Sequence, residues 1–317
     1  MTIPPKLTIT QDDDGLRLDQ LLKQRFKELP YGLLQKAFRT GKVRLNDKRM
    51  KSPGTRVKTG DTVTLYLSVR EPDNTPPGSP NTKIISLAKD FEAWILFEDK
   101  DLLVLNKPPG LATQAGTNTT ISLDRILIQY AEERYLPRIT HRLDKDTSGI
   151  IVFAKSRQAA QHMTKLFKEG TPIKTYWACV VGKPEKNQGK IDLPLGKLIG
   201  IQKEKMSSKA SDVRPALTYY KIIESNATNN ISWLELTPKT GRTHQLRVHC
   251  AESDFPILGD GKYGGRQAHP FQSRVPLCLH ARSLTFQHPA GHEKTITAPL
   301  PPAFEETMRT YIDSKGY

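Results

Sequence analysis

The sequence is poor in cysteine and shows no clustered metal ligands. It has three cysteines in 317 residues, Cys179, Cys250 and Cys278, and they are scattered without a C-x-x-C pair. An odd, scattered set argues against a disulfide framework and against a zinc site. The eight histidines show no ligand spacing either. We therefore expect a reduced, cytoplasmic protein that binds no metal.

Long apolar runs are also missing. No segment approaches the roughly 18 to 20 uninterrupted apolar residues that a membrane-spanning helix needs. Residues Met1 to Thr10 lack the basic region and apolar core of a secretory signal. The sequence thus predicts neither a membrane span nor a membrane partner.

Acidic residues are too few to balance the basic ones. There are 48 Lys and Arg against 33 Asp and Glu, a formal net charge of +15. Such an excess favours a polyanionic partner, for which nucleic acid and an anionic membrane surface are the main candidates; we expect nucleic acid and no membrane partner. The alternative at this level is a protein that is basic without a nucleic-acid partner.

A proline-rich stretch divides the chain. Residues 71–83 contain four prolines and no large apolar side chain, which is the composition of a linker. Residues 1–70 carry 15 Lys and Arg against 7 Asp and Glu, so less than a quarter of the chain holds about half of the net charge. We predict a small basic domain at 1–70, a linker at 71–90 and a larger domain at 91–317.

The first domain shows helix and strand patterns in a definite order. Apolar residues at helical spacing predict a helix from Leu16 to Phe26 and a second helix over Tyr31 to Thr40, which Gly41 would cap. Val43 to Asn46 and the alternating segment that follows Gly60-Asp61 predict two strands.

Basic residues gather in the middle of this domain. From Lys36 to Lys58 there are nine basic residues and one acid. The order of elements, with R-L-D-x-x-L near the start and Gly-Asp before the last strand, resembles the S-four type RNA-binding domain. A solvated basic face on a generic small domain is the alternative. We expect this patch to contact RNA phosphates through four basic side chains: Lys36, Arg39, Lys42 and Arg44.

The second domain alternates strand and helix patterns, with strands in the majority. We predict helices at 122–133 and 158–168. Because several predicted strands follow each other directly, the fold class is α+β with a mixed or antiparallel sheet. The predicted strands are 94–97, 102–105, 149–154, 175–181, 216–223, 231–236 and 245–249.

One loop concentrates groups that could do chemistry. Residues 139–155 place His141, Arg142, Asp144 and Asp146 directly before a buried strand, a common arrangement for catalytic residues. One carboxylate beside an arginine could stay ionised, and the other would then shape the turn. Spacing alone does not choose between the two aspartates, and an ion-paired loop of purely structural value fits equally well.

Four motifs in order give a family resemblance. His141-Arg-Leu-Asp-Lys-Asp-Thr-Ser-Gly149 resembles the signature of the RluA-type pseudouridine synthases. Val104 to Gly110, Lys174-Thr-Tyr176 and Thr240 to His249 resemble three further motifs of that family. Together they cover about residues 95–300. The resemblance implies a pseudouridine synthase catalytic domain that isomerises uridine to its carbon-linked isomer.

The resemblance also implies roles for the site residues. It makes Asp144 the essential carboxylate, acting either as a nucleophile or as a base that forms a glycal, and the sequence leaves both routes open. It makes Arg242 the cation that compensates this charge. It assigns Tyr176 to stacking on the flipped base and to proton removal from carbon five.

Three further residues and the substrate follow from the same resemblance. Arg142 is expected to displace the target nucleotide, Lys107 to lie near the pocket or the RNA backbone, and Leu246 to line the base pocket. The nearest branch is that of RluC and RluD, which modifies large-subunit ribosomal RNA. We expect no cofactor, no metal and a monomer. The alternatives are the same chemistry on transfer RNA and a non-catalytic RNA-binding ribosome assembly factor.

Overall fold

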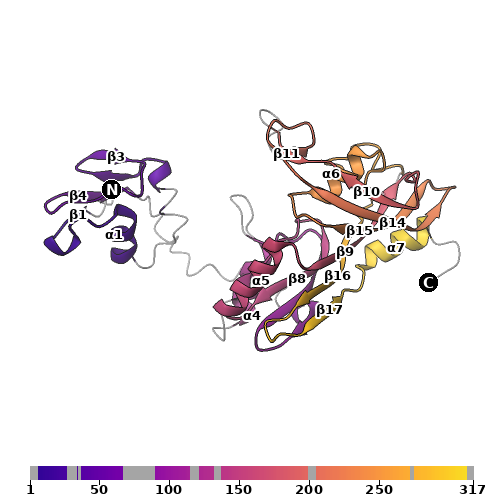
Figure 1. Cartoon of the computed structure of the whole chain (residues 1–317), viewed down its shortest axis with the longest axis horizontal. Coiled ribbons are helices and arrows are strands. Elements are labelled where there is room, and N and C mark those ends of the chain that lie inside the picture. Colours follow the sequence, from indigo (N-terminus) through magenta and orange to yellow (C-terminus); the bar gives the residue numbers. More distant parts are fainter. Residues whose placement is uncertain are drawn as a thin grey trace. The chain divides into compact units, whose positions relative to one another are not determined.

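The computed structural model describes residues 6–26, 34, 37–66, 90–114, 121–131, 137–198, 205–271 and 275–312. The chain forms two compact units, Met1–Pro80 and Asn81–Tyr317 (Figure 1). The boundary falls within the predicted linker at 71–90. Among the described residues, no helix has the length and apolar character needed to cross a membrane.

The first unit is built on a four-stranded antiparallel sheet in the order β1-β4-β2-β3. Asn46 and Asp47 both have positive φ, at 50° and 64°, and join β2 to β3 in a tight hairpin turn. Asn and Asp tolerate this conformation, so the turn chemistry fixes the hairpin. The elements are β1 (Lys6–Thr8), α1 (Leu18–Arg25), β2 (Val43–Leu45), β3 (Lys48–Met50) and β4 (Thr62–Leu65).

The predicted first helix and both predicted strands of this unit are confirmed. Leu18, Leu21 and Leu22 of α1 are fully buried against the sheet, as their spacing requires. Of the predicted helix at 31–40 the structure describes only residue 34 and residues 37–40, and residues 34 and 37–39 are helical. Lys36 lies outside the described residues.

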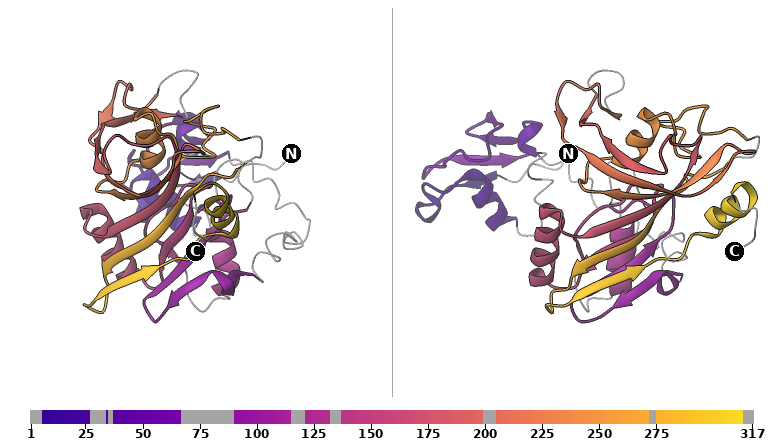
Figure 2. Two further views of the ribbon diagram at one scale, coloured as in Figure 1. Left: turned by 90° about the vertical axis from the view of Figure 1, so that its right-hand side faces the viewer. Right: turned by 45° about the vertical axis from the view of Figure 1, so that its right-hand side comes forward.

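The second unit is organised by a ten-stranded sheet in the order β10-β14-β15-β9-β16-β8-β6-β5, with β17 on β16 and β7 on β8. Among the described strands, only β16 and β8 pair in parallel. The predicted α+β class with a mixed sheet is therefore confirmed, and Figure 2 shows the twist of this sheet from two sides. The strands are β5 (Ile95–Glu98), β6 (Leu102–Lys107), β7 (Arg138–Ile139), β8 (Ser148–Ala154), β9 (Ile173–Val181), β10 (Gln188–Asp192), β14 (Leu217–Asn226), β15 (Ile231–Pro238), β16 (Leu279–Gln287) and β17 (Glu293–Thr297).

Helices cover both faces of this sheet, because its central strands are apolar on both sides. Leu103 and Ile151 pack with α4 (Leu123–Ala131), whereas Val104 and Val152 pack with α5 (Arg157–Glu169). Neighbouring residues of a strand face opposite sides, so the two helices lie on opposite faces. At the other half of the sheet, α6 (Gln245–Glu252) and α7 (Pro302–Tyr311) divide the faces in the same way.

The predicted strand at 245–249 is wrong, because these residues begin helix α6. Their alternation of polar and apolar side chains imitates a strand, but all of them are buried. The polar ones are satisfied inside the protein: Gln245 donates to Leu217 O, and His249 bonds to Thr218 and to Leu193 O. The alternation of polar and apolar residues at 245–249 therefore does not correspond to alternating exposed and buried positions.

A glycine explains how two strands of the sheet meet. Gly149, the second residue of β8, has φ of +106°, and a Cβ placed there would lie 2.3 Å from the carbonyl oxygen of Ala281 on β16. No side chain fits this approach, and the conformation itself favours glycine. The glycine that ends the signature loop, residues 141–149, is thus required by the pairing of β8 with β16.

Candidate active site

A cavity of about 790 Å³ lies where the signature loop meets the ends of the sheet. Asp144 and Tyr176 both line it, from the loop before β8 and from β9 respectively. Arg142, Arg242 and Leu246 line it as well, so the structure brings together five of the residues singled out in the second domain. Lys107 is not among the lining residues.

The loop that carries Asp144 is fixed by its neighbours. The ring of His141 stacks on Phe167 of α5 at 4.2 Å, and its Nε2 accepts the Val152 N–H at 3.0 Å. The hydroxyl of Thr113 donates to Leu143 O at 2.8 Å. These contacts hold the loop rigidly and so fix the position of the Asp144 carboxylate at the cavity.

Lys107 supports the same loop from beneath. It is fully buried, and its Nζ donates to the carbonyl oxygens of Pro108, Leu111 and Lys145, each at 2.9 Å. Burial lowers its pKa to about 7, against the charges of Asp146 and Asp144, which raise it. Three carbonyl acceptors use all three protons of an ammonium, so the geometry favours the charged form. Lys107 therefore braces the loop and does not line the cavity.

Asp144 faces a histidine that the sequence analysis did not single out as a site residue. His244 Nε2 lies 3.8 Å from Asp144 Oδ1, and both side chains are partly exposed. His244 Nδ1 lies 2.6 Å from the hydroxyl of Tyr263. Tyr176 shares the cavity, and burial, followed by the charge of Asp144, raises the pKa of its hydroxyl. Tyr176 is thus protonated at neutral pH.

The expected ion pair between Arg242 and Asp144 is not formed among the residues the structure describes. Arg242 Nε instead donates to the carbonyl oxygen of Pro215 at 3.1 Å. The charge of Arg247, on α6, does interact with that of Asp144. Residues 245–249 begin helix α6, so Arg247 lies in its first turn, three residues after His244, and both side chains line the cavity. The incorrect strand prediction concealed this relationship.

Arg247 is held by a buried acid. Its Nε and Nη2 donate to the two oxygens of Asp260 at 2.8 and 2.7 Å. Burial lowers the pKa of Arg247, but the hydrogen bonds to Asp260 and the charges of Asp260 and Asp144 outweigh it and hold the pKa above its usual value. Such a bidentate pair fixes the guanidinium rigidly.

The first unit presents part of its predicted basic patch. Arg39 and Lys42 are exposed, and the Arg44 guanidinium lies over the ring of Tyr66 at 4.7 Å. Tyr66 is itself 37% exposed, so a basic and aromatic surface faces solvent. Contact with RNA through this surface stays a prediction.

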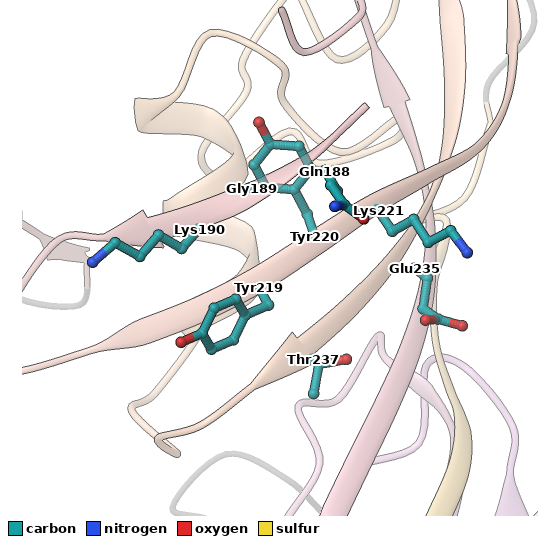
Figure 3. A pocket seen from close by; sticks show the side chains of 8 residues that line it. All are labelled: Gln188, Gly189, Lys190, Tyr219, Tyr220, Lys221, Glu235 and Thr237. Carbon is teal, nitrogen blue, oxygen red and sulfur yellow. The ribbon is translucent and has the colours of Figure 1, made fainter. Parts of the chain in front are cut away.

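A second hollow of about 450 Å³ lies on the outer face of β10, β14 and β15 (Figure 3). Tyr219, Lys190 and Thr237 occupy one row across these strands. Tyr219 is 43% exposed. The hollow contains no residue of the signature loop, so the cavity around Asp144 is the candidate active site.

Three potential metal ligands lie just beyond the C-terminal ends of β5 and β16. Oxygens of Asp99 and Asp101 and a nitrogen of His288 lie within 4.8 Å of one another. His288 Nδ1 accepts the Ala290 N–H, which places the proton of a neutral ring on Nε2, 3.1 Å from Asp99. That tautomer favours an acid–histidine contact over metal ligation, and the absence of a metal stays a prediction.

Known proteins match most of the chain. Residues 101–252 match the family described as RNA pseudouridylate synthase. The "Ribosomal large subunit pseudouridine synthase C" of Rickettsia conorii is 34% identical over 90% of this chain and 94% of its own. The protein of the same name from Vibrio cholerae is 32% identical over 95% of both chains. The solved structure of human RNA pseudouridylate synthase domain containing 4 is 28% identical, with a TM-score of 0.61 over 73% of this chain and 98% of that chain.

Proposed function

The chain belongs to the RNA pseudouridylate synthase family and is an RNA pseudouridine synthase, and we propose that it isomerises specific uridines of large-subunit ribosomal RNA. Two relatives that carry this substrate in their names align with nearly the whole chain. The finer assignments, a cytoplasmic monomer without a cofactor, belong to the same proposal.

The observation that carries the proposed chemistry is the placement of Asp144 and Tyr176 in one cavity, beside a fixed guanidinium. The isomerisation requires that the glycosidic bond between the ribose and N1 breaks, that the uracil turns, and that carbon five bonds to the ribose. The proton on carbon five then leaves, and N1 gains a proton. We propose that the ionised Asp144 starts this sequence, as nucleophile or as base. Exclusion of water when the RNA binds would strengthen either role, provided that a cation offsets the charge.

We assign the charge-compensating role to Arg247, whose charge interacts with Asp144. Arg242, expected from the sequence to have that role, lies at the same cavity and is free in this scheme to contact an RNA phosphate. Tyr176 offers a flat ring for stacking on the flipped base and a protonated hydroxyl. Base flipping costs a few kcal/mol, and stacking returns roughly 1 to 3 kcal/mol per base.

Arg142 and Leu246 complete the scheme. Arg142 is exposed at the cavity, as a residue that displaces the target nucleotide must be. Leu246 is 7% exposed and offers an apolar wall to the base. For the first unit we propose the RNA-binding role of an S-four type domain, which the exposed basic surface supports.

Pseudouridine mapping tests the function directly. Ribosomal and transfer RNA are compared from cells with the native protein, without it, and with Asp144→Ala. We expect specific large-subunit uridines to lose modification in both altered strains. If pseudouridines are lost only from transfer RNA, transfer RNA is the substrate. If the strain without the protein loses modification and the Asp144→Ala strain does not, Asp144 is not essential. No change in either strain would favour the non-catalytic assembly factor.

A further inference from the structure

His244 and Tyr263 form a hydrogen-bonded pair beside Asp144. The His244 Nδ1 and the Tyr263 hydroxyl oxygen lie 2.6 Å apart, and the other ring nitrogen, Nε2, lies 3.8 Å from Asp144 Oδ1. Successive contacts therefore connect the Tyr263 hydroxyl, which belongs to a turn after α6, through the His244 ring to the Asp144 carboxylate.

The contacts of Tyr263 and His244 favour one direction of hydrogen bonding. The backbone N–H of Met206 donates to the Tyr263 hydroxyl oxygen at 3.2 Å, which leaves the hydroxyl proton available to donate to His244 Nδ1. The Asp144 carboxylate can only accept and lies on the Nε2 side of the ring, so it favours the His244 proton on Nε2.

The turn that carries Tyr263 is held by the same acid that holds Arg247. Asp260 Oδ1 accepts the backbone N–H groups of Lys262 and Tyr263 at 3.1 and 3.2 Å. The Arg247 guanidinium lies over the Tyr263 ring at 5.2 Å. Tyr263 is thus fixed through both its backbone and its ring.

His244 is held in an unusual backbone conformation. Its φ is 54° and its ψ 21°, at the residue that precedes α6. A non-glycine residue in the left-handed region is strained, and such strain concentrates at functional sites where the surroundings over-determine it. Here the conformation directs the ring between Asp144 and Tyr263.

We propose that Tyr263 is a positioning residue for the proposed reaction, on which this inference rests: through His244 it presents an N–H to the Asp144 carboxylate. The contact orients the carboxylate and offsets part of its charge without adding a proton. The 3.8 Å separation is longer than a hydrogen bond. Catalytic contacts of this kind often tighten only once substrate is bound.

The burial of His244 and the charges around it together favour the neutral ring that this arrangement requires. Burial lowers its pKa most, the charge of Asp144 raises it, those of Arg247 and Lys262 lower it, and that of Asp260 raises it. The resulting pKa is below the usual value for histidine. Tyr263 adds to this effect, because a hydroxyl that donates to Nδ1 opposes a second ring proton.

The first experiment uses the full chain with Tyr263→Phe. We expect the single-turnover rate of pseudouridine formation on a large-subunit RNA transcript to fall about 10- to 100-fold, with unchanged RNA affinity. The acidic limb of the pH–rate profile should move to higher pH, because His244 then takes up a second proton more readily. Tyr219→Phe, which changes an exposed tyrosine of the outer sheet face (Figure 3), is the matched control and should leave both unchanged. A wild-type rate and profile for Tyr263→Phe would overturn the proposal.

A double-mutant cycle separates positioning from general damage to the fold. Gln at position 244 can keep an N–H near Asp144 without needing Tyr263, so adding Tyr263→Phe to His244→Gln should cost little more. Fully multiplicative rate losses would overturn the proposal.

A spectroscopic measurement keeps this inference separate from the proposed function. In ¹⁵N-histidine NMR of the free protein, His244 should show one tautomer, with the proton on Nε2, and Tyr263→Phe should produce a mixture. If the wild-type protein makes no pseudouridine, the proposed function fails and the catalytic role fails with it. The tautomer of His244 then still shows whether the Tyr263 hydroxyl donates its hydrogen bond to His244 Nδ1.

Discussion

The ammonium of Lys107 and the carbonyl oxygen of Lys145 are 2.9 Å apart, although 38 positions separate the residues in the chain. This bond ties the end of β6 to the residue that follows Asp144. Two more carbonyls bind the same ammonium. The position of the Asp144 carboxylate thus depends on a buried lysine that does not itself line the cavity.

Replacing Lys107 by Met should destabilise the second unit and displace the loop of Asp144. The bond to Leu111 O is buried and the other two are partly buried; a buried carbonyl left without a partner costs about 1 to 3 kcal/mol, so we expect a loss of at least about 1 kcal/mol. Denaturant unfolding measures this loss, and a single-turnover assay measures the accompanying fall in rate. Lys165→Met, at a lysine whose side chain is 75% exposed, is the control and should change neither. Equal stability of the two variants would contradict the bracing role.

Replacing Arg247 by Met should lower the stability of the fold, whereas replacing Arg242 by Met should lower RNA affinity. Arg247→Met leaves Asp260 as a buried, unpaired charge, which costs about 3 to 5 kcal/mol. Arg242→Met removes a surface contact to Pro215 O and should change stability by less than about 0.5 kcal/mol. We expect Arg242→Met to weaken RNA binding instead. Unfolding curves and RNA titrations of both variants provide the comparison, and a larger stability loss at Arg242 would refute the assignment.

His280 should make the protein sensitive to acid. Burial lowers its pKa from 6.5 to about 4. The folded state therefore binds this proton less readily than the unfolded state, so the contribution is fully present above pH 6.5. It is lost as the pH falls from 6.5 towards 4, by about 3 kcal/mol in total at about 1.4 kcal/mol per pH unit.

Unfolding midpoints measured between pH 7.5 and 4 test this dependence. His280→Asn should be less stable at pH 7.5, because Ser148 Oγ and Ala298 O contact this ring, but it should lose less stability on acidification. His269→Asn, at an exposed histidine, should keep the wild-type slope. An unchanged slope for His280→Asn would show that the acid sensitivity arises elsewhere.

The basic patch of the first unit should act mainly through phosphates. Combined Arg39→Ala, Lys42→Ala and Arg44→Ala should weaken binding to folded ribosomal RNA and reduce the slope of log K against log salt. The reduction is about 0.7 to 0.9 for each phosphate contact removed. Affinity across a salt series measures it, and the single-turnover rate at saturating enzyme should change little. An unaltered salt slope would reject an RNA-binding role for these residues.

Periodicity predicted the elements that have one buried face or a regular alternation. The leucines of α1 and the apolar runs of β6 and β8 are examples. Residues 279–312, which form β16, β17 and α7, were not assigned. Strand β16 pairs with β8 and β9, which lie far from it in the sequence, so its place in the sheet depends on non-local contacts.

By itself the sequence determined the family, the division of charge and the presence of Asp144 and Tyr176 in recognisable motifs, because these are properties of local residue order. Only the tertiary structure decided which cation and which histidine face Asp144. His244 immediately precedes helix α6 and Arg247 lies in its first turn, and their partners, Tyr263 and Asp260, come from a turn further along the chain. A buried polar residue is paired through space, and its partner is fixed by folding rather than by spacing along the chain.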